Sequence, residues 1–167
     1  MRETVATDVL RAFLGTMAAV FIYSIAGAGA PALMVVFNAF SIVVLYFAVR
    51  RGEMFGALLG TMCGLAQDAF SLGVFGVGGL TKTLLGFWAG YVSRRIDVVP
   101  FSRNALFVLV MSVLEVVLWV LLTALVRLRA VNLEGGLLFV QPVVTAVLAS
   151  SLFALERWIA RRSSRGA

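Results

Sequence analysis

Three ionisable side chains stand inside apolar stretches of this chain of 167 residues, and they are the first candidates for chemistry. Asp68 and Lys82 lie in GLAQDAFSLGVFGVGGLTKTLLG, residues 64–86, and Glu115 lies in FVLVMSVLEVVLW, residues 107–119. Two carboxyl groups on different segments could in principle form an acid–base couple. Because an ionisable group at membrane depth costs about 2.5–3.5 kcal/mol on insertion scales, each of the three needs a compensating partner.

The sequence contains no complete match to a recognised catalytic motif, which argues against an enzyme. The stretch GVGGLTKT, residues 76–83, is similar to the phosphate loop G-x-x-x-x-G-K-[ST], but Thr81 stands where that motif requires a glycine. The chain has no histidine and one cysteine, Cys63, which argues against a zinc or haem site and excludes an intramolecular disulfide. We therefore expect no catalytic residues, no cofactor and no bound metal.

The composition is that of an integral membrane protein. Hydrophobic residues make up 62% of the chain, charged residues 13%, and the mean hydropathy is +1.04. A typical soluble domain has about 25% charged residues. The sequence predicts one integral-membrane domain, residues 1–167, with a short cytoplasmic tail at 156–167.

Continuous apolar runs of helical length predict the elements that position the three charges. These runs do not alternate with polar residues, so they indicate helices and not barrel strands. The expected fold is all-α, a bundle of six transmembrane helices with both termini cytoplasmic. The predicted spans are 9–27, 31–49, 54–72, 77–92, 104–126 and 136–155.

Arginine sets the predicted orientation. Eleven arginines fall at the ends of the spans that would share one side of the membrane, whereas only Arg127 and Arg129 fall on the other. Since basic residues concentrate on the cytoplasmic side, the net charge of +6 indicates topology and not a nucleic-acid-binding patch. Aromatic rings typical of membrane interfaces fall at the same predicted ends: Tyr46, Trp88, Tyr91 and Trp158.

Glycines recur at every fourth position in the third and fourth spans, on the helix face that carries the charge of each span. They are Gly56, Gly60 and Gly64 with Asp68, and Gly78, Gly86 and Gly90 with Lys82. Stripes of small residues let two membrane helices approach closely. In an antiparallel hairpin turning near 73–77, the pairs expected at equal depth are Asp68–Lys82, Gly64–Gly86 and Gly60–Gly90.

Several interpretations of the charges stay open at this point. Asp68 and Lys82 could form a buried ion pair that fixes the hairpin, could reflect packing alone, or could serve transport. Glu115 could be protonated or bound to another helix. Its candidate donors are Ser112, Asn38, Gln141 or a helix of a partner protein.

The segment QDAFSLGVFGVGGLTKTLLGFWAGYVSRR, residues 67–95, resembles the MreD family of rod shape-determining membrane proteins of bacteria. The features shared with that family are Asp68, Ser71, Gly76, Leu80, Gly86 and Gly90. The family often has a proline in the turn, where this chain has Val74. Length and span count are similar over nearly the whole chain, whereas the residue-specific likeness covers the third and fourth spans.

This resemblance implies a place in the cell-elongation machinery of the bacterial inner membrane. It implies a non-catalytic scaffold that binds MreC and supports peripheral peptidoglycan synthesis by RodA and its partner transpeptidase, with MreB filaments as indirect partners. The implied fold is similar to the substrate-binding subunits of energy-coupling-factor transporters. That likeness leaves two alternatives, a small-molecule uptake subunit for a vitamin-like solute or a proton-coupled transporter with Glu115 as the carrier.

Overall fold

The computed structural model describes residues 2–29, 37–70, 74–96, 101–127 and 137–163. Within these ranges the chain is all-helical and contains no strand, as predicted for the fold class. The six helices are α1 (Arg2–Gly29), α3 (Ala39–Arg51), α4 (Glu53–Phe70), α5 (Val77–Ser93), α6 (Phe101–Arg127) and α7 (Leu137–Ser163).

Helix boundaries agree with the sequence for three helices and differ for three. α1 begins at Arg2, seven residues before the predicted start at residue 9. α3 begins at Ala39 and not at residue 31, because the Asn38 side chain accepts a hydrogen bond from the Ser41 amide (3.3 Å) and caps the helix there. Residues 31–36 lie outside the described ranges. α7 continues through Ser163, so most of the predicted tail is a helical extension. The good helix formers Ala, Glu and Arg make up five of the eight residues of this extension, ERWIARRS.

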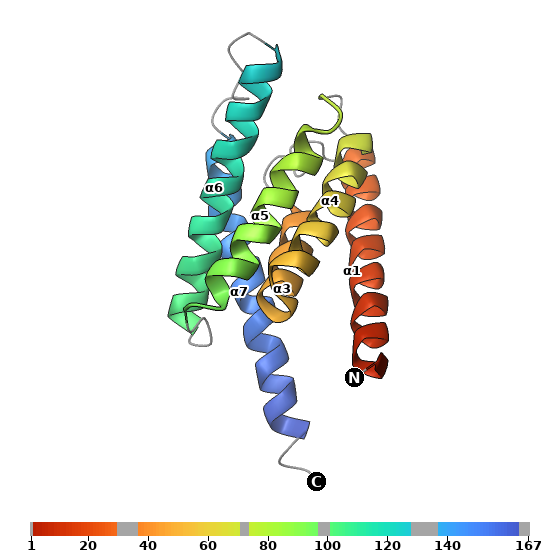
Figure 1. Ribbon diagram of the computed structural model, residues 1–167, viewed down its shortest axis with the longest axis vertical. Coiled ribbons are helices and arrows are strands. Elements are labelled where there is room, and N and C mark those ends of the chain that lie inside the picture. The colour runs from red at the N-terminus through yellow and green to blue at the C-terminus, as the bar shows by residue number, and fades with distance from the viewer. Residues whose placement is uncertain (1, 30–36, 71–73, 97–100, 128–136, 164–167) are drawn as a thin grey trace.

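α3 lies at the centre of the bundle and separates two apolar cores. α4 and α5 form a closely packed antiparallel hairpin against α3, with α1 on one side and the α6–α7 pair on the other (Figure 1). One face of α3 packs with α5, α6 and α7 through Ile42, Leu45 and Ala48. The opposite face packs with α1 and α4 through Phe40, Val44 and Phe47. α3 therefore couples the two halves of the molecule.

Polar and apolar residues are distributed in the reverse of the usual soluble pattern. Lys82, Glu115 and Asp68 are buried, whereas large apolar side chains cover the outside of the bundle, among them Phe21 and Leu58, each 67% exposed. Two helical segments, Ala6–Ile25 of α1 and Ser102–Val126 of α6, are long and apolar enough to cross a membrane by length and composition. A membrane location is thus supported for part of the chain.

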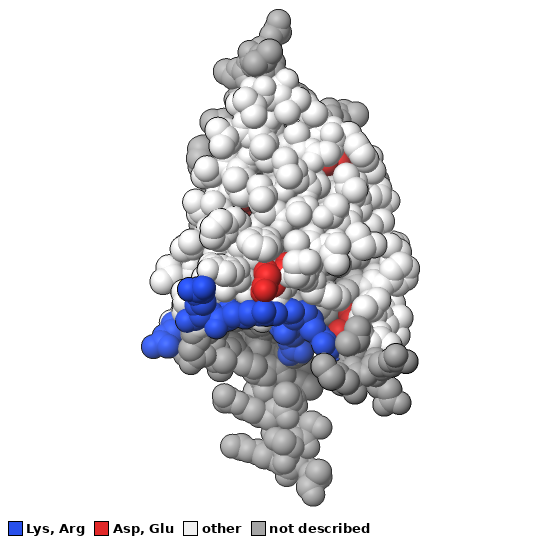
Figure 2. Space-filling model, in the orientation of Figure 1, with Lys and Arg blue, Asp and Glu red and all other residues white. Residues whose placement is uncertain are grey.

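Arginine side chains gather at one end of the bundle, which we call the arginine end. Its described members are Arg11, Arg50, Arg51, Arg94, Arg95, Arg103 and Arg162. The start of α1 and the end of α7 lie at this same end, and a band of basic side chains crosses the surface there (Figures 1 and 2). The predicted one-sided distribution of arginine therefore holds for the described residues.

Candidate functional site: two buried charge sites in the helix bundle

Lys82 lies at the centre of a polar cluster built from three helices. Its ammonium group forms an ion pair with the carboxylate of Glu115 on α6. It also donates to the Ser41 hydroxyl (2.6 Å) and the Asn38 side-chain oxygen (3.3 Å), both at the start of α3. With Lys82 only 2% and Glu115 5% exposed, the pair is enclosed by protein.

The Glu115 carboxylate is satisfied by the same residues. Its Oε1 accepts from the Ser41 hydroxyl (2.6 Å) and from the Asn38 amide (3.1 Å), in addition to Lys82. Because Asn38 and Ser41 occupy the N-terminus of α3, the negative charge also lies at the favourable end of that helix dipole. A buried ion pair is tolerable only when hydrogen bonds satisfy its remaining donors and acceptors, and this cluster supplies them for the Lys82 ammonium and for Oε1 of Glu115.

The cluster changes one prediction and bears out another. Lys82 pairs with Glu115, so of the interpretations left open for Asp68 and Lys82 the ion pair between them within the hairpin is not the one observed. Asn38, one of the donors expected for Glu115, makes that hydrogen bond. The Ser112 hydroxyl, another expected donor, has no partner among the described residues.

Asp68 is compensated by backbone amides. Its carboxylate accepts hydrogen bonds from the amides of Gly76 (2.8 Å), Gly78 (3.1 Å) and Gly79 (3.1 Å). These are amides at the start of α5, which no residue within the helix can satisfy, and the helix dipole there favours an anion. Asp68 therefore closes the α4–α5 turn by capping α5 across eight or more residues of sequence.

Two glycines make this cap sterically possible. Gly76 has φ +97°, in the left-handed region that side chains disfavour. At Gly78, the nearest atom to an added Cβ would be Oδ1 of Asp68 itself, so any side chain there would displace the carboxylate. Of the residues that carry the family resemblance, Asp68 and Gly76 thus act together, whereas Ser71 lies outside the described residues.

The glycine stripes pack backbone against backbone, as predicted, but in a different register. An added Cβ on Gly56 would lie 2.5 Å from the Gly86 carbonyl oxygen, and one on Gly64 would lie 2.6 Å from Cα of Gly79. Gly60 faces the backbone of Lys82. The expected partners were Gly90 for Gly60 and Gly86 for Gly64, so the true register is displaced by eight residues, which is two four-residue repeats.

Periodicity explains the error in register. A stripe with a small residue at every fourth position can meet its partner again after a shift of four or eight residues, so spacing alone cannot choose among these registers. The observed register moves Asp68 past the start of α5, where it caps the helix, and moves Lys82 opposite Gly60. Gly90 then faces the turn at Gly52 and Glu53.

Two polar contacts were not predicted from the sequence, one across the α4–α5 hairpin and one within the Lys82–Glu115 cluster. The hydroxyls of Thr61 and Thr83 are hydrogen-bonded across the α4–α5 contact (2.7 Å). Ser41 bridges Lys82 and Glu115. The Asn38–Ser41 spacing is that of a capped helix start, which could have drawn attention to Ser41. Nothing in the spacing marks Thr61 and Thr83 as a pair.

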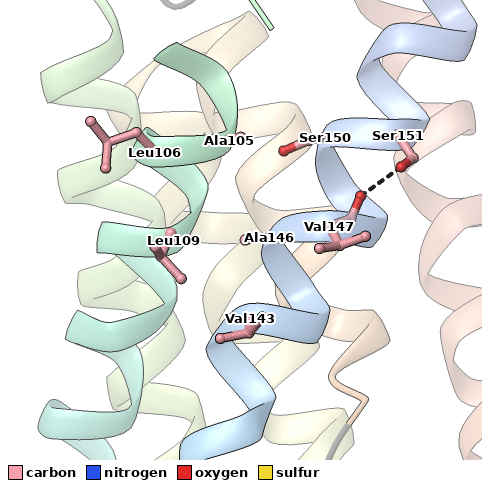
Figure 3. A pocket seen from close by; sticks show the side chains of 8 residues that line it. All are labelled: Ala105, Leu106, Leu109, Val143, Ala146, Val147, Ser150 and Ser151. Atoms are coloured by element: carbon pink, nitrogen blue, oxygen red, sulfur yellow. Dashed lines mark hydrogen bonds between the residues drawn. The ribbon is translucent and has the colours of Figure 1, made fainter. Parts of the chain in front are cut away.

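An apolar groove between α6 and α7 is separate from both charge sites (Figure 3). It has a volume of about 430 Å³ and is lined by Ala105, Leu106, Leu109, Val143, Ala146, Val147, Ser150 and Ser151. The Ser151 hydroxyl donates back to the Val147 carbonyl (2.7 Å). No ionisable side chain lines the groove, and the described residues contain no group of three potential metal ligands.

Comparison with known proteins gives no match: no protein family, no curated protein and no solved structure is significantly similar to the chain. The features that bear on function are therefore the two charge sites, the buried charges inside an apolar outer surface, and the segment 67–95 that resembles the MreD family. Chemically, both sites hold their charges in closed hydrogen-bonded arrangements.

Proposed function

We propose that the chain is a multi-pass membrane bundle that works as a non-catalytic scaffold. The observation that carries the membrane part is the reversed polarity of the molecule: a buried Lys82–Glu115 pair inside, and an outer surface of large apolar residues. A hydrocarbon surrounding makes that outer surface favourable, whereas water would leave an apolar area far larger than soluble monomers expose. The arginine end would then face the cytoplasm, and the host membrane would be the bacterial inner membrane.

The scaffold part of the proposal is supported by how the charges are used. Asp68 is held by three backbone amides, and Lys82 and Glu115 hold each other with help from α3. Every one of these contacts fixes helices relative to one another. Charges committed in this way suit a rigid platform better than a carrier, whose charges must exchange partners during transport.

The particular assembly we propose is the cell-elongation machinery. Residues 67–95, which resemble the MreD family, are the segment that forms the α5 cap and half of the glycine contact. The chain would bind MreC and so support RodA, its partner transpeptidase and, indirectly, MreB filaments. The alternatives remain a small-molecule uptake subunit and a proton-coupled transporter, because either would place polar groups such as the Lys82–Glu115 cluster in the bundle interior.

Depletion of the protein in its rod-shaped host tests the assembly. Cells should lose their rod shape, and MreC should co-purify with the tagged protein. Cells that stay rod-shaped, together with a failure of MreC to co-purify, would contradict the scaffold proposal. Solute retained by the purified protein would instead favour an uptake subunit.

A charge-free variant separates the scaffold from a transporter. Lys82→Met with Glu115→Leu removes both members of the pair, and replacing a buried ion pair by apolar residues is often tolerated. The scaffold proposal expects this double variant to restore rod shape when it reaches normal levels. A variant that accumulates normally, binds MreC and yet fails to restore shape would show that the charges themselves carry function.

A further inference from the structure

Three helices at the arginine end repeat one local arrangement. An arginine stacks on the aromatic ring four residues before it: Arg50 on Tyr46 in α3 (4.8 Å), Arg162 on Trp158 in α7 (4.8 Å), and Arg95, in the turn that directly follows α5, on Tyr91 of α5 (4.7 Å). Distances are from the guanidinium carbon to the ring centroid. Residues four apart share a helix face, so each ring lies directly beneath its arginine. We call these three the aromatic–arginine pairs.

Stacking on a ring leaves the hydrogen-bonding edge of a guanidinium available. The interaction uses the flat face of the group, whereas its five N–H donors lie in the plane and match a phosphate in bidentate geometry. Within the described part of the chain, Arg95 and Arg162 form no ion pair. Their donors are therefore not committed to a carboxylate there.

Other arginines at this end are already committed to the two described carboxylates. Arg51 and Arg11 pair with Asp8, and Arg94 pairs with Glu53 (3.1 Å). At the arginine end, seven described arginines thus stand against two described carboxylates, an excess of five positive charges. Part of this basic surface is the band seen in Figure 2. An anionic surface is the complementary partner.

The exposed aromatic rings of these pairs indicate the depth in the membrane at which the anionic surface meets the protein. Trp158 is 55% and Tyr91 38% exposed, and Tyr91 belongs to an exposed aromatic group with Phe87 and Trp88. Amphipathic rings settle at the boundary between hydrocarbon and headgroups. An arginine one turn further toward the end of the helix would then reach the level of the lipid phosphates.

We infer that the aromatic–arginine pairs are binding sites for the phosphate of anionic phospholipid headgroups. A lipid is favoured over an acidic protein segment because the same pair recurs on three different helices, whereas a docked protein would need complementary residues gathered on one face. The inference rests on the membrane embedding proposed above, but not on the cell-elongation role.

The test uses the full chain in lipid nanodiscs of phosphatidylcholine alone or mixed with phosphatidylglycerol. Native mass spectrometry counts the phosphatidylglycerol molecules that stay bound. The double variant Arg95→Gln/Arg162→Gln is compared with Arg11→Gln/Arg103→Gln, which removes two exposed arginines of the same end that stack on none of the described rings. The two variants have the same net charge.

Retention should fall by about fivefold for each stacked arginine removed, since the ring holds the guanidinium in place for charge-assisted, bidentate hydrogen bonds to the phosphate, an interaction that contributes on that scale beyond unspecific surface attraction. The control variant should retain phosphatidylglycerol nearly as the parent does, and Tyr91→Phe should do so better than Tyr91→Leu. Equal losses in both double variants would overturn the inference in favour of unspecific charge. Loss of an acidic cytoplasmic protein from the variant, with lipid retention unchanged, would overturn it in favour of a protein partner.

The same experiment separates this inference from the membrane proposal. A protein that enters the nanodiscs but shows no preference for phosphatidylglycerol contradicts the lipid sites alone. A protein that does not enter nanodiscs of either composition contradicts the membrane embedding on which the sites depend.

Discussion

The two buried charge sites of this bundle solve the same problem in different ways. Asp68 is neutralised by amides of the helix that follows it in sequence, within eleven residues. Lys82 is neutralised by Glu115, 33 residues away, and by the start of α3, more than 40 residues away. The first site closes a hairpin, whereas the second joins three helices. A buried charge that lies beside the start of the next helix, as Asp68 does, can be satisfied by the free backbone amides there. A charge further inside a helix, as Lys82 is, needs a side-chain partner from another helix.

The largest effect is expected from breaking the side-chain cluster. Glu115→Leu leaves the Lys82 ammonium buried without its counter-ion, which should lower the stability of the folded state by about 3–5 kcal/mol. Unfolding of the purified protein in mixed detergent micelles measures the loss. The double variant Lys82→Met/Glu115→Leu should recover most of it, and a double variant less stable than Glu115→Leu would contradict a paired role.

The backbone contact between α4 and α5 should respond next. Gly60→Ala places a Cβ against the Lys82 carbonyl and should cost about 1–3 kcal/mol, because neither backbone can move without separating the helices. Gly15→Ala in α1 is the matched control, since its Cβ would meet Val43 at an ordinary 3.5 Å. The control should be neutral or stabilising by up to about 1 kcal/mol. Equal costs at the two positions would refute the close contact.

A smaller loss is expected at the Asp68 cap. Asp68→Asn keeps the shape of the side chain but loses the charge at the start of α5, so the cost should be about 0.5–2 kcal/mol. Amide hydrogen exchange should quicken at the amides whose acceptor oxygen becomes the NH2 group, which are Gly76 and Gly79 if Oδ2 is replaced or Gly78 if Oδ1 is replaced, while α6 stays protected. Faster exchange spread evenly over all helices would argue that the cap is not a local device.

Local features of this fold could be predicted from the sequence, and non-local ones could not. Continuous apolar runs located the helices, and the four-residue glycine spacing predicted the close α4–α5 contact. The predicted register was wrong by eight residues because a regular four-residue repeat can meet its partner again after a shift of one or two repeats. The Lys82–Glu115 pair was not predicted because nothing in the sequence says which face of α6 meets α5. The start of α3 was misplaced because the capping role of Asn38 was not considered.

Because Asp68 and Lys82 have different partners, the two charge sites should contribute independently to stability. A pair of double-mutant cycles tests this independence directly. The cycles combine Lys82→Met with Glu115→Leu and Lys82→Met with Asp68→Asn, each followed by unfolding in detergent. We expect a coupling energy of several kcal/mol between Lys82 and Glu115, the size expected for a buried ion pair. Between Lys82 and Asp68 we expect at most about 0.5 kcal/mol. Strong coupling between Lys82 and Asp68, with little between Lys82 and Glu115, would contradict this independence.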